Sequence, residues 1–427
     1  MTGPNDYLMM IDGEMTAAES GQWFTSLNPA NEEEIGRVPL ASAADIDRAV
    51  KAGLRWQPDW NDTPVVERAA LLREVGRRLI EKQNDILDLE VRDTGNTIGK
   101  MRHDHGAAVA QLDCYAGLGL EVKGETVSAS PKTWHLTMRE PYGMVGRIVP
   151  FNHPIYFAIC ALAGPLLTGN SVIVKTPDQS PLSGAVLGEI CREVLPNGVV
   201  HIVSGTGLVT GDAIVRHPAV RRISFTGSVP TGLAIQRAAA ETCVKHVTLA
   251  LGGKNLMVVF PDVDPDQAAD EAIAGMNFAW QGQSCGSRSR LMLHESIYDA
   301  VMSRVRHRVA AIVMATRSIR VPRWARSIPT KKFPAPSCRY SAGATKARLW
   351  RWPTRQNTAC QPPSGQTISR RRSRWVARST AATSGSTLPA PISSECPSAA
   401  ARTVASAARS ASANYSATRN PRHFTSR

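Results

Sequence analysis

The sequence predicts an α/β protein built on a doubly wound parallel sheet. Short β-branched runs alternate with helical runs between residues 171 and 251. Strict alternation implies right-handed crossovers, which cover both faces of a parallel sheet with helices. The chain of 427 residues is also too long for one small core, so two or three domains are expected. On pattern alone, this architecture is typical of nucleotide-binding proteins.

Helices and extended segments are expected before the alternating region. Residues 41–57 have helical spacing after a capping Ser or Asp. Residues 63–95 have the spacing of two amphipathic helices, which begin at Thr63-Pro64 and end at Gly95. Residues 122–149 alternate in polarity and are punctuated by Gly and Pro, which predicts strands.

The alternating region itself divides into short elements. The expected strands and helices, in chain order, are strands 171–175, 198–205, 219–227 and 244–251, with helices 181–195, 211–218 and 231–241 between them.

Composition narrows the class of protein. No apolar run approaches the eighteen or so residues that cross a bilayer, so no membrane partner is expected. The N-terminus lacks a basic stretch followed by an apolar core, so it does not resemble a secretory signal, and the cytoplasm is the expected compartment. The eight Cys are scattered singly, without zinc-site spacing, so no metal is expected and most should be free thiols.

The turn after the third expected strand is a candidate phosphate site. Gly227 and Ser228 lie between that strand and a helix that starts near Pro230. A backbone without side chains can approach a phosphate, and a helix N-terminus offers unpaired N–H groups. The turn lacks the G-x-G-x-x-G pattern, however, and a strand-Gly-helix turn is purely structural in most α/β proteins.

Cys285 is the candidate nucleophile. It lies between Gly282 and Gly286 in a polar stretch, GQSCGSRSR. The glycines let the chain bend sharply and leave space beside the sulfur, and backbone N–H groups there can stabilise an oxyanion. The alternative for any single Cys is a small buried hydrophobic residue, although the neighbouring Gln and Ser make a plain core position less suitable.

Five motifs together resemble the aldehyde dehydrogenase superfamily. They occur in the order and spacing of that family, over about residues 1–313, and are IVPFNHP (148–154), VIVKTPDQSPLSG (172–184), FTGSVPTG (225–232), LALGGKN (249–255) and GQSCGSRSR (282–290). The resemblance implies a dinucleotide-binding domain over 1–251, with an oligomerisation hairpin within 122–149, and the start of a catalytic domain over 252–313.

The resemblance also implies a reaction. A small-molecule aldehyde would be oxidised to a carboxylic acid with NAD, or with NADP as the alternative, as cofactor. Cys285 would attack the carbonyl, while the Asn152 side-chain amide and the Cys285 backbone N–H would hold the oxyanion. Water would then hydrolyse the resulting thioester. The family forms homo-oligomers, so the same is implied here, although the composition of the C-terminal quarter puts this in doubt.

Cofactor-binding residues follow from the same resemblance. Lys175 resembles the Lys that contacts the adenosine ribose, and Asp178 stands where the family usually has a ribose-binding Glu. The shorter acid leaves the choice between NAD and NADP open. The implied cofactor-binding set is Pro150, Phe151, Lys175, Asp178, Gly211, Phe225, Gly227, Ser228 and Leu251.

One position departs from the family pattern in a way that affects chemistry. The residue before Leu251 is usually the Glu that activates the deacylating water, and here it is Ala250. Losing a general base typically costs about a hundredfold to ten-thousandfold in rate. Acylation with slow thioester release is expected, because Glu271, the nearest acid in sequence, lies in a helical context that gives no reason for it to enter the site.

The last quarter of the chain has a different composition. Of the 50 Lys and Arg and 36 Asp and Glu, residues 314–427 hold 21 and one, which leaves 29 basic and 35 acidic residues before them. This segment is expected to be a disordered basic tail. A nucleic-acid arm is an alternative, but the mildly acidic remainder makes a nucleic-acid partner unlikely for the whole chain.

A frameshift near codon 313 is a third interpretation of the unusual composition of residues 314–427. With permissible codons, residues 314–328 read from the third base of each codon can give GDPFDPGTEMGPI. The same frame lets 382–387 give GNVWVN and lets 396–409 give PFGG followed by a GRE ending. These three segments resemble later family motifs in family order. The hypothesis is that the tail replaced the rest of the catalytic domain, which leaves an impaired enzyme or a non-catalytic remnant that binds the cofactor.

Overall fold

The computed structural model describes residues 6–130, 132–312 and 339–343. A seven-stranded sheet forms its centre, in the order β11-β10-β7-β8-β9-β1-β2. The strands of this sheet are β1 (Met9–Ile11), β2 (Glu14–Thr16), β7 (Met144–Ile148), β8 (Ser171–Lys175), β9 (Val200–Val203), β10 (Val220–Gly227) and β11 (His246–Leu251).

The five strands from β11 to β9 run parallel, and β1 and β2 add an antiparallel edge. The strand order reverses between β7 and β10: the chain winds outward through β8 and β9 on one side of β7 and then through β10 and β11 on the other. Ile148, the last residue of β7, pairs with Lys175 of β8 and Phe225 of β10. Ligands of doubly wound sheets bind at the carboxyl ends of the strands near such a reversal, which is where the implied cofactor residues lie.

Helices cover both faces of the sheet, as the alternation predicted. On β8, Val172 and Val174 join the core with α2, α4, α5 and α6, whereas Ile173 joins the opposite core with α1, α7 and α8. The helices are α1 (Ala43–Asp62), α2 (Val65–Glu81), α3 (Gln83–Thr94), α4 (Ile98–Gly117), α5 (Pro154–Leu167), α6 (Leu182–Val194), α7 (Asp212–Arg216) and α8 (Val229–Ala240). A strand buried on both faces reads as a continuous apolar run, and β8 does.

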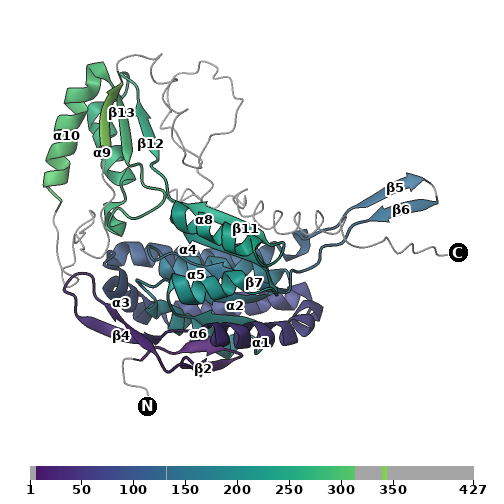
Figure 1. Cartoon of the computed structure of the whole chain (residues 1–427). Helices are drawn as coiled ribbons and strands as arrows, with labels where there is room; N and C mark the ends of the chain where they lie inside the picture. Colours follow the sequence, from purple (N-terminus) through teal and green to yellow (C-terminus); the bar gives the residue numbers. More distant parts are fainter. Residues whose placement is uncertain (1–5, 131, 313–338, 344–427) are drawn as a thin grey trace.

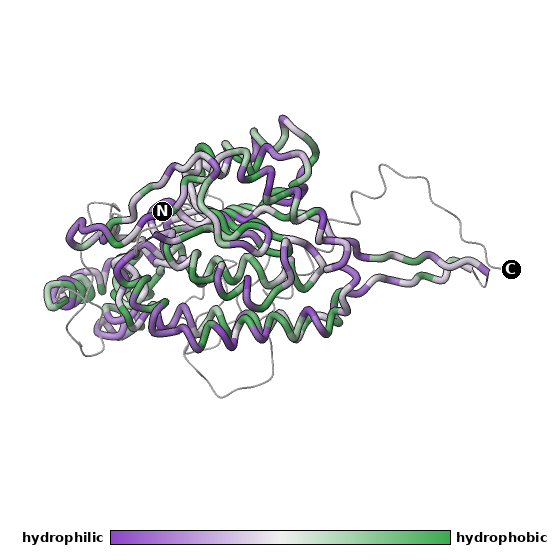
Figure 2. Tube along the Cα trace, turned by 90° about the horizontal axis from the view of Figure 1, so that it is seen from below, coloured by the Kyte–Doolittle hydropathy of each residue, from purple (hydrophilic) through white to green (hydrophobic). Residues whose placement is uncertain are grey.

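The expected strand segment 122–149 divides between two sheets. Its first part forms the hairpin of β5 (Thr126–Ser130) and β6 (Thr133–Leu136), which projects from the body (Figures 1 and 2). Its last part, β7, is a strand of the main sheet. Every described residue of the two hairpin strands is exposed. The alternation of polar and apolar residues therefore could not show which part of this segment forms the projecting hairpin and which part joins the main sheet.

A smaller unit follows β11 (Figure 1). Strands β12 (Leu256–Val259), β13 (Arg290–His294) and β14 (Arg339–Gly343) form a parallel sheet. Helices α9 (Pro265–Gly275) and α10 (Tyr298–Ala310) cover it through a core of their own. Strand β14 departs from the expected disordered tail at these five residues; the rest of the tail lies outside the described residues.

Several elements were not predicted from the sequence. The start of the chain, read as irregular, contains β1, β2 and a two-stranded sheet of β3 (Trp23–Leu27) and β4 (Glu34–Pro39). Helices α4 and α5 were not assigned either. Helix α5 is apolar almost all round, since it is buried between α4 and the sheet, and it lacks the one-sided periodicity that reveals a surface helix.

Candidate active site

The Cys285 turn is built from backbone conformations that bend the chain. After α9 ends, Asn277, Gln281 and Gly282 have φ angles of 56°, 58° and 66°. The left-handed region is costly for residues other than Gly, and a one-turn helix (Phe278–Trp280) separates the first two of these bends. Cys285 is half-buried, and its carbonyl oxygen accepts a hydrogen bond from Asn255 Nδ2 at 2.7 Å. The GGKN segment therefore fixes one side of the turn.

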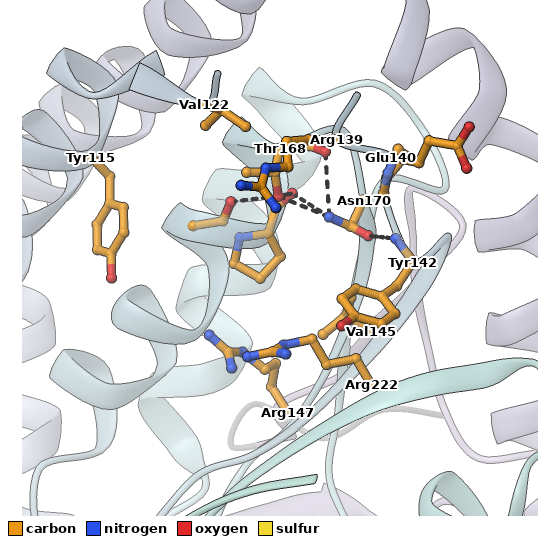
Figure 3. Close-up of a pocket in the computed structure, with 13 residues that line it drawn as sticks. Tyr115, Val122, Arg139, Glu140, Tyr142, Val145, Arg147, Thr168, Asn170 and Arg222 are labelled. Carbon is orange, nitrogen blue, oxygen red and sulfur yellow. Dashed lines mark hydrogen bonds between the residues drawn. The ribbon is translucent and has the colours of Figure 1, made fainter. Parts of the chain in front are cut away.

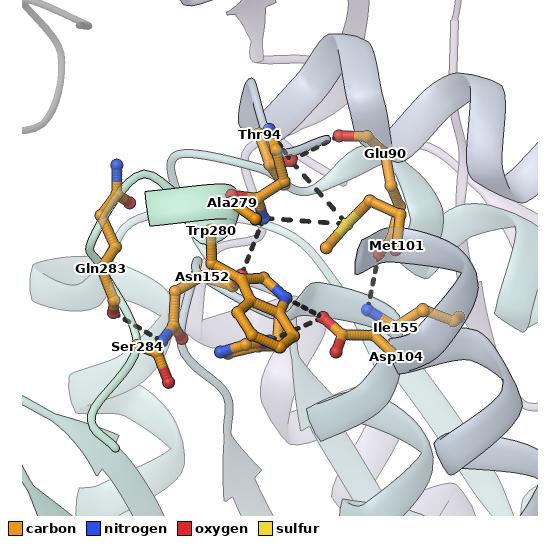
Figure 4. A network of polar contacts seen from close by, with 12 residues as sticks. Glu90, Thr94, Met101, Asp104, Asn152, Ile155, Ala279, Trp280, Gln283 and Ser284 are labelled. Atoms are coloured by element: carbon orange, nitrogen blue, oxygen red, sulfur yellow. Dashed lines mark hydrogen bonds and ion pairs between the residues drawn. The ribbon is translucent and has the colours of Figure 1, made fainter. Parts of the chain in front are cut away.

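Asn152 meets this turn from the loop after β7 (Figure 4). Its Nδ2 donates to the carbonyl oxygen of Gln283 at 2.9 Å, and its own carbonyl oxygen accepts from Asn96 Nδ2 at 3.0 Å. Asn152 is only 8% exposed. The fold thus brings Asn152 within one hydrogen bond of a residue two positions before Cys285.

A buried acid, Asp104 on α4, links the two loops. Its Oδ2 accepts from Trp280 Nε1 at 2.9 Å and lies 2.6 Å from His153 Nδ1 (Figure 4). Trp280 also packs against Leu87, Val91 and Met101. Sequence reasoning missed Asp104, since helix α4 was not predicted and acids are rarely buried without a partner.

A second buried acid, Glu90 on α3, holds the start of α5. Its Oε1 accepts from the Ile155 backbone N–H at 2.7 Å and from Ser183 Oγ at 2.9 Å. Its Oε2 is buried without a hydrogen-bond partner among the described residues. Burial raises the pKa of Glu90 to about 8, so the acid is largely neutral at pH 7. Glu90 fixes the backbone three residues after Asn152 and was also missed.

The implied ribose-binding residues lie at the end of β8. Lys175 is 2% exposed, and its Nζ donates to Asp178 Oδ1 at 2.5 Å and to the Thr176 carbonyl oxygen at 2.8 Å. Burial lowers the pKa of Lys175, although Asp178 opposes this. The other Asp178 oxygen accepts from the Gly207 backbone N–H at 3.0 Å. A Cβ at Gly211 would lie 3.7 Å from Cδ of Lys175, so the helical turn at 207–211 packs beside the aliphatic part of this side chain.

The turn between β10 and α8 is compact. Ser228 caps α8, since its Oγ accepts from the Thr231 backbone N–H at 3.3 Å. A Cβ on Gly227 would come within 2.3 Å of the Phe225 ring, and one on Gly232 within 2.8 Å of Leu251. Phe225 and Leu251 therefore explain why both positions need glycine, and Phe225 is itself buried between β7 and β11.

The remaining implied positions are simply placed. Pro150 is buried, and Phe151 is half-buried with its carbonyl oxygen accepting from Ser180 Oγ at 2.8 Å. Ala250 is exposed on β11 and pairs with Thr226. Glu271 is engaged by Arg288, whose Nη2 lies 3.0 Å from its Oε2, so the ion pair ties this acid to its own part of the fold.

Neither a membrane-crossing helix nor a metal-binding cluster occurs within the part of the chain that the structure describes.

Comparison with known proteins decides the family. The model of the family described as "Aldehyde dehydrogenase family" matches residues 15–320. The chain belongs to the aldehyde dehydrogenase family. Aldehyde dehydrogenase tropH of Talaromyces stipitatus is 39% identical over 305 residues, which are 71% of this chain and 59% of that protein. An aldehyde dehydrogenase of Aspergillus niger is 35% identical over 303 residues, 70% of this chain and 61% of its own length.

Solved structures agree with this family assignment. A mutant aldehyde dehydrogenase from Bacillus cereus superposes with a TM-score of 0.71 at 32% identity, covering 74% of this chain and 66% of that one. A putative aldehyde dehydrogenase from Burkholderia cenocepacia gives 0.70 at 35% identity, covering 72% and 63%. The chain spans about three fifths of the length of the curated relatives it matches.

Proposed function

We propose that this chain oxidises a small aldehyde through a covalent adduct on Cys285, with NAD or NADP as hydride acceptor, and that it releases the product slowly. The observation that supports this most directly is the hydrogen bond from Asn152 Nδ2 to the Gln283 carbonyl oxygen. It brings the implied oxyanion donor and the implied nucleophile, far apart in the sequence, to one turn.

The chain's own residues would act in two steps. The Cys285 thiolate adds to the carbonyl carbon, and the oxygen becomes an oxyanion. An Asn side chain carries two N–H groups, so the bond to Gln283 leaves one for the oxyanion, beside the Cys285 backbone N–H. Such preorganised donors contribute about 3–4 kcal/mol each to acyl-transfer reactions. Loss of hydride from the thiohemiacetal carbon gives a thioester on Cys285.

A nicotinamide dinucleotide, when bound, supplies the acceptor for that hydride. Residues at the strand ends fit such a group: Lys175 offers a buried ammonium, and Gly227 leads directly into the N-terminus of α8, which Ser228 caps. Among structural neighbours, an aldehyde dehydrogenase from Bacillus cereus is described as an NAD+ complex and an enzyme from E. coli as NADP dependent. We infer either cofactor for this chain, bound by the nine residues implied by the family.

Thioester release is the step that this chain supports poorly. Ala250 cannot accept a proton from water, and the Glu271 carboxylate is held by Arg288.

We also propose that a frameshift near codon 313 removed the rest of the catalytic domain. Sequencing the encoding DNA around this codon would test it. The competing function is a non-catalytic remnant that still binds the cofactor. We further propose the cytoplasm as its location.

Rapid mixing of the full chain with an aldehyde and NAD+ tests the proposal. We expect a burst of NADH close to one equivalent per chain, followed by slow turnover. Cys285→Ser should abolish the burst, and Ala250→Glu should raise the slow rate about a hundredfold or more. Cofactor binding without any burst would favour the remnant, whereas fast turnover by the unmodified chain would contradict the role assigned to Ala250.

A further inference from the structure

A pocket with several arginines lies apart from the candidate active site. It opens between the C-terminal end of α5 and the strands β7 and β10 (Figure 3). We call it the arginine pocket and define it by Arg139, Arg147, Arg222, Tyr115, Tyr142 and Val145, which all line it. Cys285, Asn152 and Lys175 are not among its lining residues, so it is a separate feature.

The sheet register places two of these arginines together. Arg222 on β10 pairs with Val145 on β7, and Arg147 follows two residues later, so alternation puts both side chains on one face. A hydrogen bond to the protein orients each guanidinium group. Arg147 Nε donates to the Ala161 carbonyl oxygen at 2.9 Å, and Arg222 Nη2 donates to Thr248 Oγ1 at 3.3 Å. Figure 3 shows both groups at the floor of the pocket.

The electrostatics of the arginine pocket favour an anion. Burial lowers the pKa of Arg147 to about 10, and the charge that acts on it most strongly is that of Arg222. Burial and Arg222 also lower the pKa of His246, which pairs with Arg222 on β11. Glu140 lines the pocket too, but its carboxylate points away from the two guanidinium groups (Figure 3). Two like charges held side by side, with Arg222 buried and Arg147 half-buried, attract a negative partner.

The shape of the guanidinium groups and the pocket walls indicate which anion. A guanidinium presents paired N–H donors that match a carboxylate. The walls add apolar surface from Val122, Val145 and Pro165 and the Tyr115 ring, which suits a hydrocarbon or aromatic body better than a fully hydrated phosphate. We propose that the arginine pocket binds a small organic carboxylate, with Arg147 and Arg222 holding its charged end. This proposal does not depend on the proposed function.

Calorimetric titration of the full chain with benzoate, at constant ionic strength, tests it. We expect benzoate to bind, its neutral amide benzamide not to bind, and inorganic phosphate to bind more weakly. Arg147→Met should weaken benzoate binding about tenfold or more, because it removes a charge-assisted hydrogen bond. The control is Arg73→Met, at an exposed position of α2, where Arg73 pairs with Asp113. Unchanged benzoate affinity in Arg147→Met, or phosphate binding as tightly as benzoate, would overturn the proposal.

A chemical measurement covers the case in which Arg147→Met does not fold. The unmodified chain is treated with phenylglyoxal, which modifies arginine, and its peptides are quantified by mass spectrometry. Benzoate should slow the modification of Arg147 severalfold without changing that of Arg73. Equal rates of Arg147 modification with and without benzoate refute the proposal. If Arg147 is protected only when a second copy of the chain binds, the site is a self-association surface instead and the proposal is wrong.

Discussion

Buried acids at single positions prepare the candidate active site. Glu90 and Asp104 are 1% and 5% exposed, and neither touches Cys285 in any hydrogen bond described above. Glu90 holds the backbone at Ile155, and Asp104 holds Trp280 and His153. A buried carboxyl is costly unless hydrogen bonds or protonation compensate it. Both buried carboxyls therefore lower the stability of the fold, and their hydrogen bonds fix the geometry of the Asn152 and Cys285 loops.

The Glu90 carboxyl should make stability depend on pH. Below its ordinary pKa of 4.5, both the folded and the unfolded chain hold the proton. As the pH rises to about 8, the folded pKa, only the unfolded chain loses it, so the free energy of unfolding falls. Glu90→Gln removes this loss while keeping an oxygen acceptor. Urea unfolding should show little difference at pH 4.5 and a gain on the order of 4 kcal/mol for the variant at pH 8.

The control for this experiment is Glu67→Gln, at an exposed position on α2, which also removes one negative charge. A Glu90→Gln variant whose stability runs parallel to that of the parent chain from pH 4.5 to 8 would show that Glu90 is already ionised in the folded state.

At the scale of elements, side-chain caps fix where helices begin. Helix α1 starts with a reciprocal capping box, in which Ser42 Oγ accepts from the Asp45 backbone N–H and Asp45 Oδ2 accepts from the Ser42 backbone N–H. Asp45 is completely buried and also accepts from the Glu19 backbone N–H at 3.1 Å. The cap thus joins α1 to the segment after β2.

Removing the cap of α1 should lower the free energy of unfolding. Ser42→Ala leaves the Asp45 backbone N–H without its side-chain acceptor, and we expect a loss of about 0.5–2 kcal/mol in the free energy of unfolding. Ser303→Ala, on the exposed face of α10, is the control and should be neutral or slightly stabilising, because Ala favours helix. Equal effects of the two substitutions in chemical denaturation would argue against a structural role for the cap.

At the scale of the whole molecule, the hairpin of β5 and β6 leaves large apolar side chains in water. Val127, Trp134, Leu136 and Met138 are 54%, 67%, 69% and 83% exposed, and the hairpin extends away from the body (Figure 2). Trp134 and Leu136 lie on one face of β6, since they are two residues apart, and large exposed apolar side chains that share a face indicate an interface. We propose that this hairpin mediates homo-oligomerisation, as the family resemblance implies.

Charges on the hairpin should therefore change the assembly state. In sedimentation velocity we expect the parent chain to self-associate and a Trp134→Asp/Leu136→Asp variant to shift toward monomer, with at least about tenfold weaker association. Ile80→Asp is the matched control, since Ile80 is 57% exposed on α2, outside the hairpin. Self-association of equal strength in the hairpin variant and the parent would place the interface elsewhere.

Local patterns predicted the central sheet because its strands carry their signals in a few adjacent residues. Strands β8, β10 and β11 lie within two residues of their predicted ends, since β-branched runs bounded by turn residues specify a buried strand locally. The N-terminal strands were missed, because β1 is three residues long and depends on pairing with β9. The assigned roles of the site residues remain predictions, although Asn152 does meet the Cys285 turn.

The sequence alone determined the family, the alternation of elements and the missing acid at position 250, because motifs and single residues are properties of the linear chain. Only the tertiary structure revealed the bond between Asn152 and Gln283, the buried Glu90 and Asp104, and the side-by-side placement of Arg147 and Arg222. These depend on strand register and on packing between segments distant in sequence, and no local pattern encodes the burial that gives such charges their chemistry.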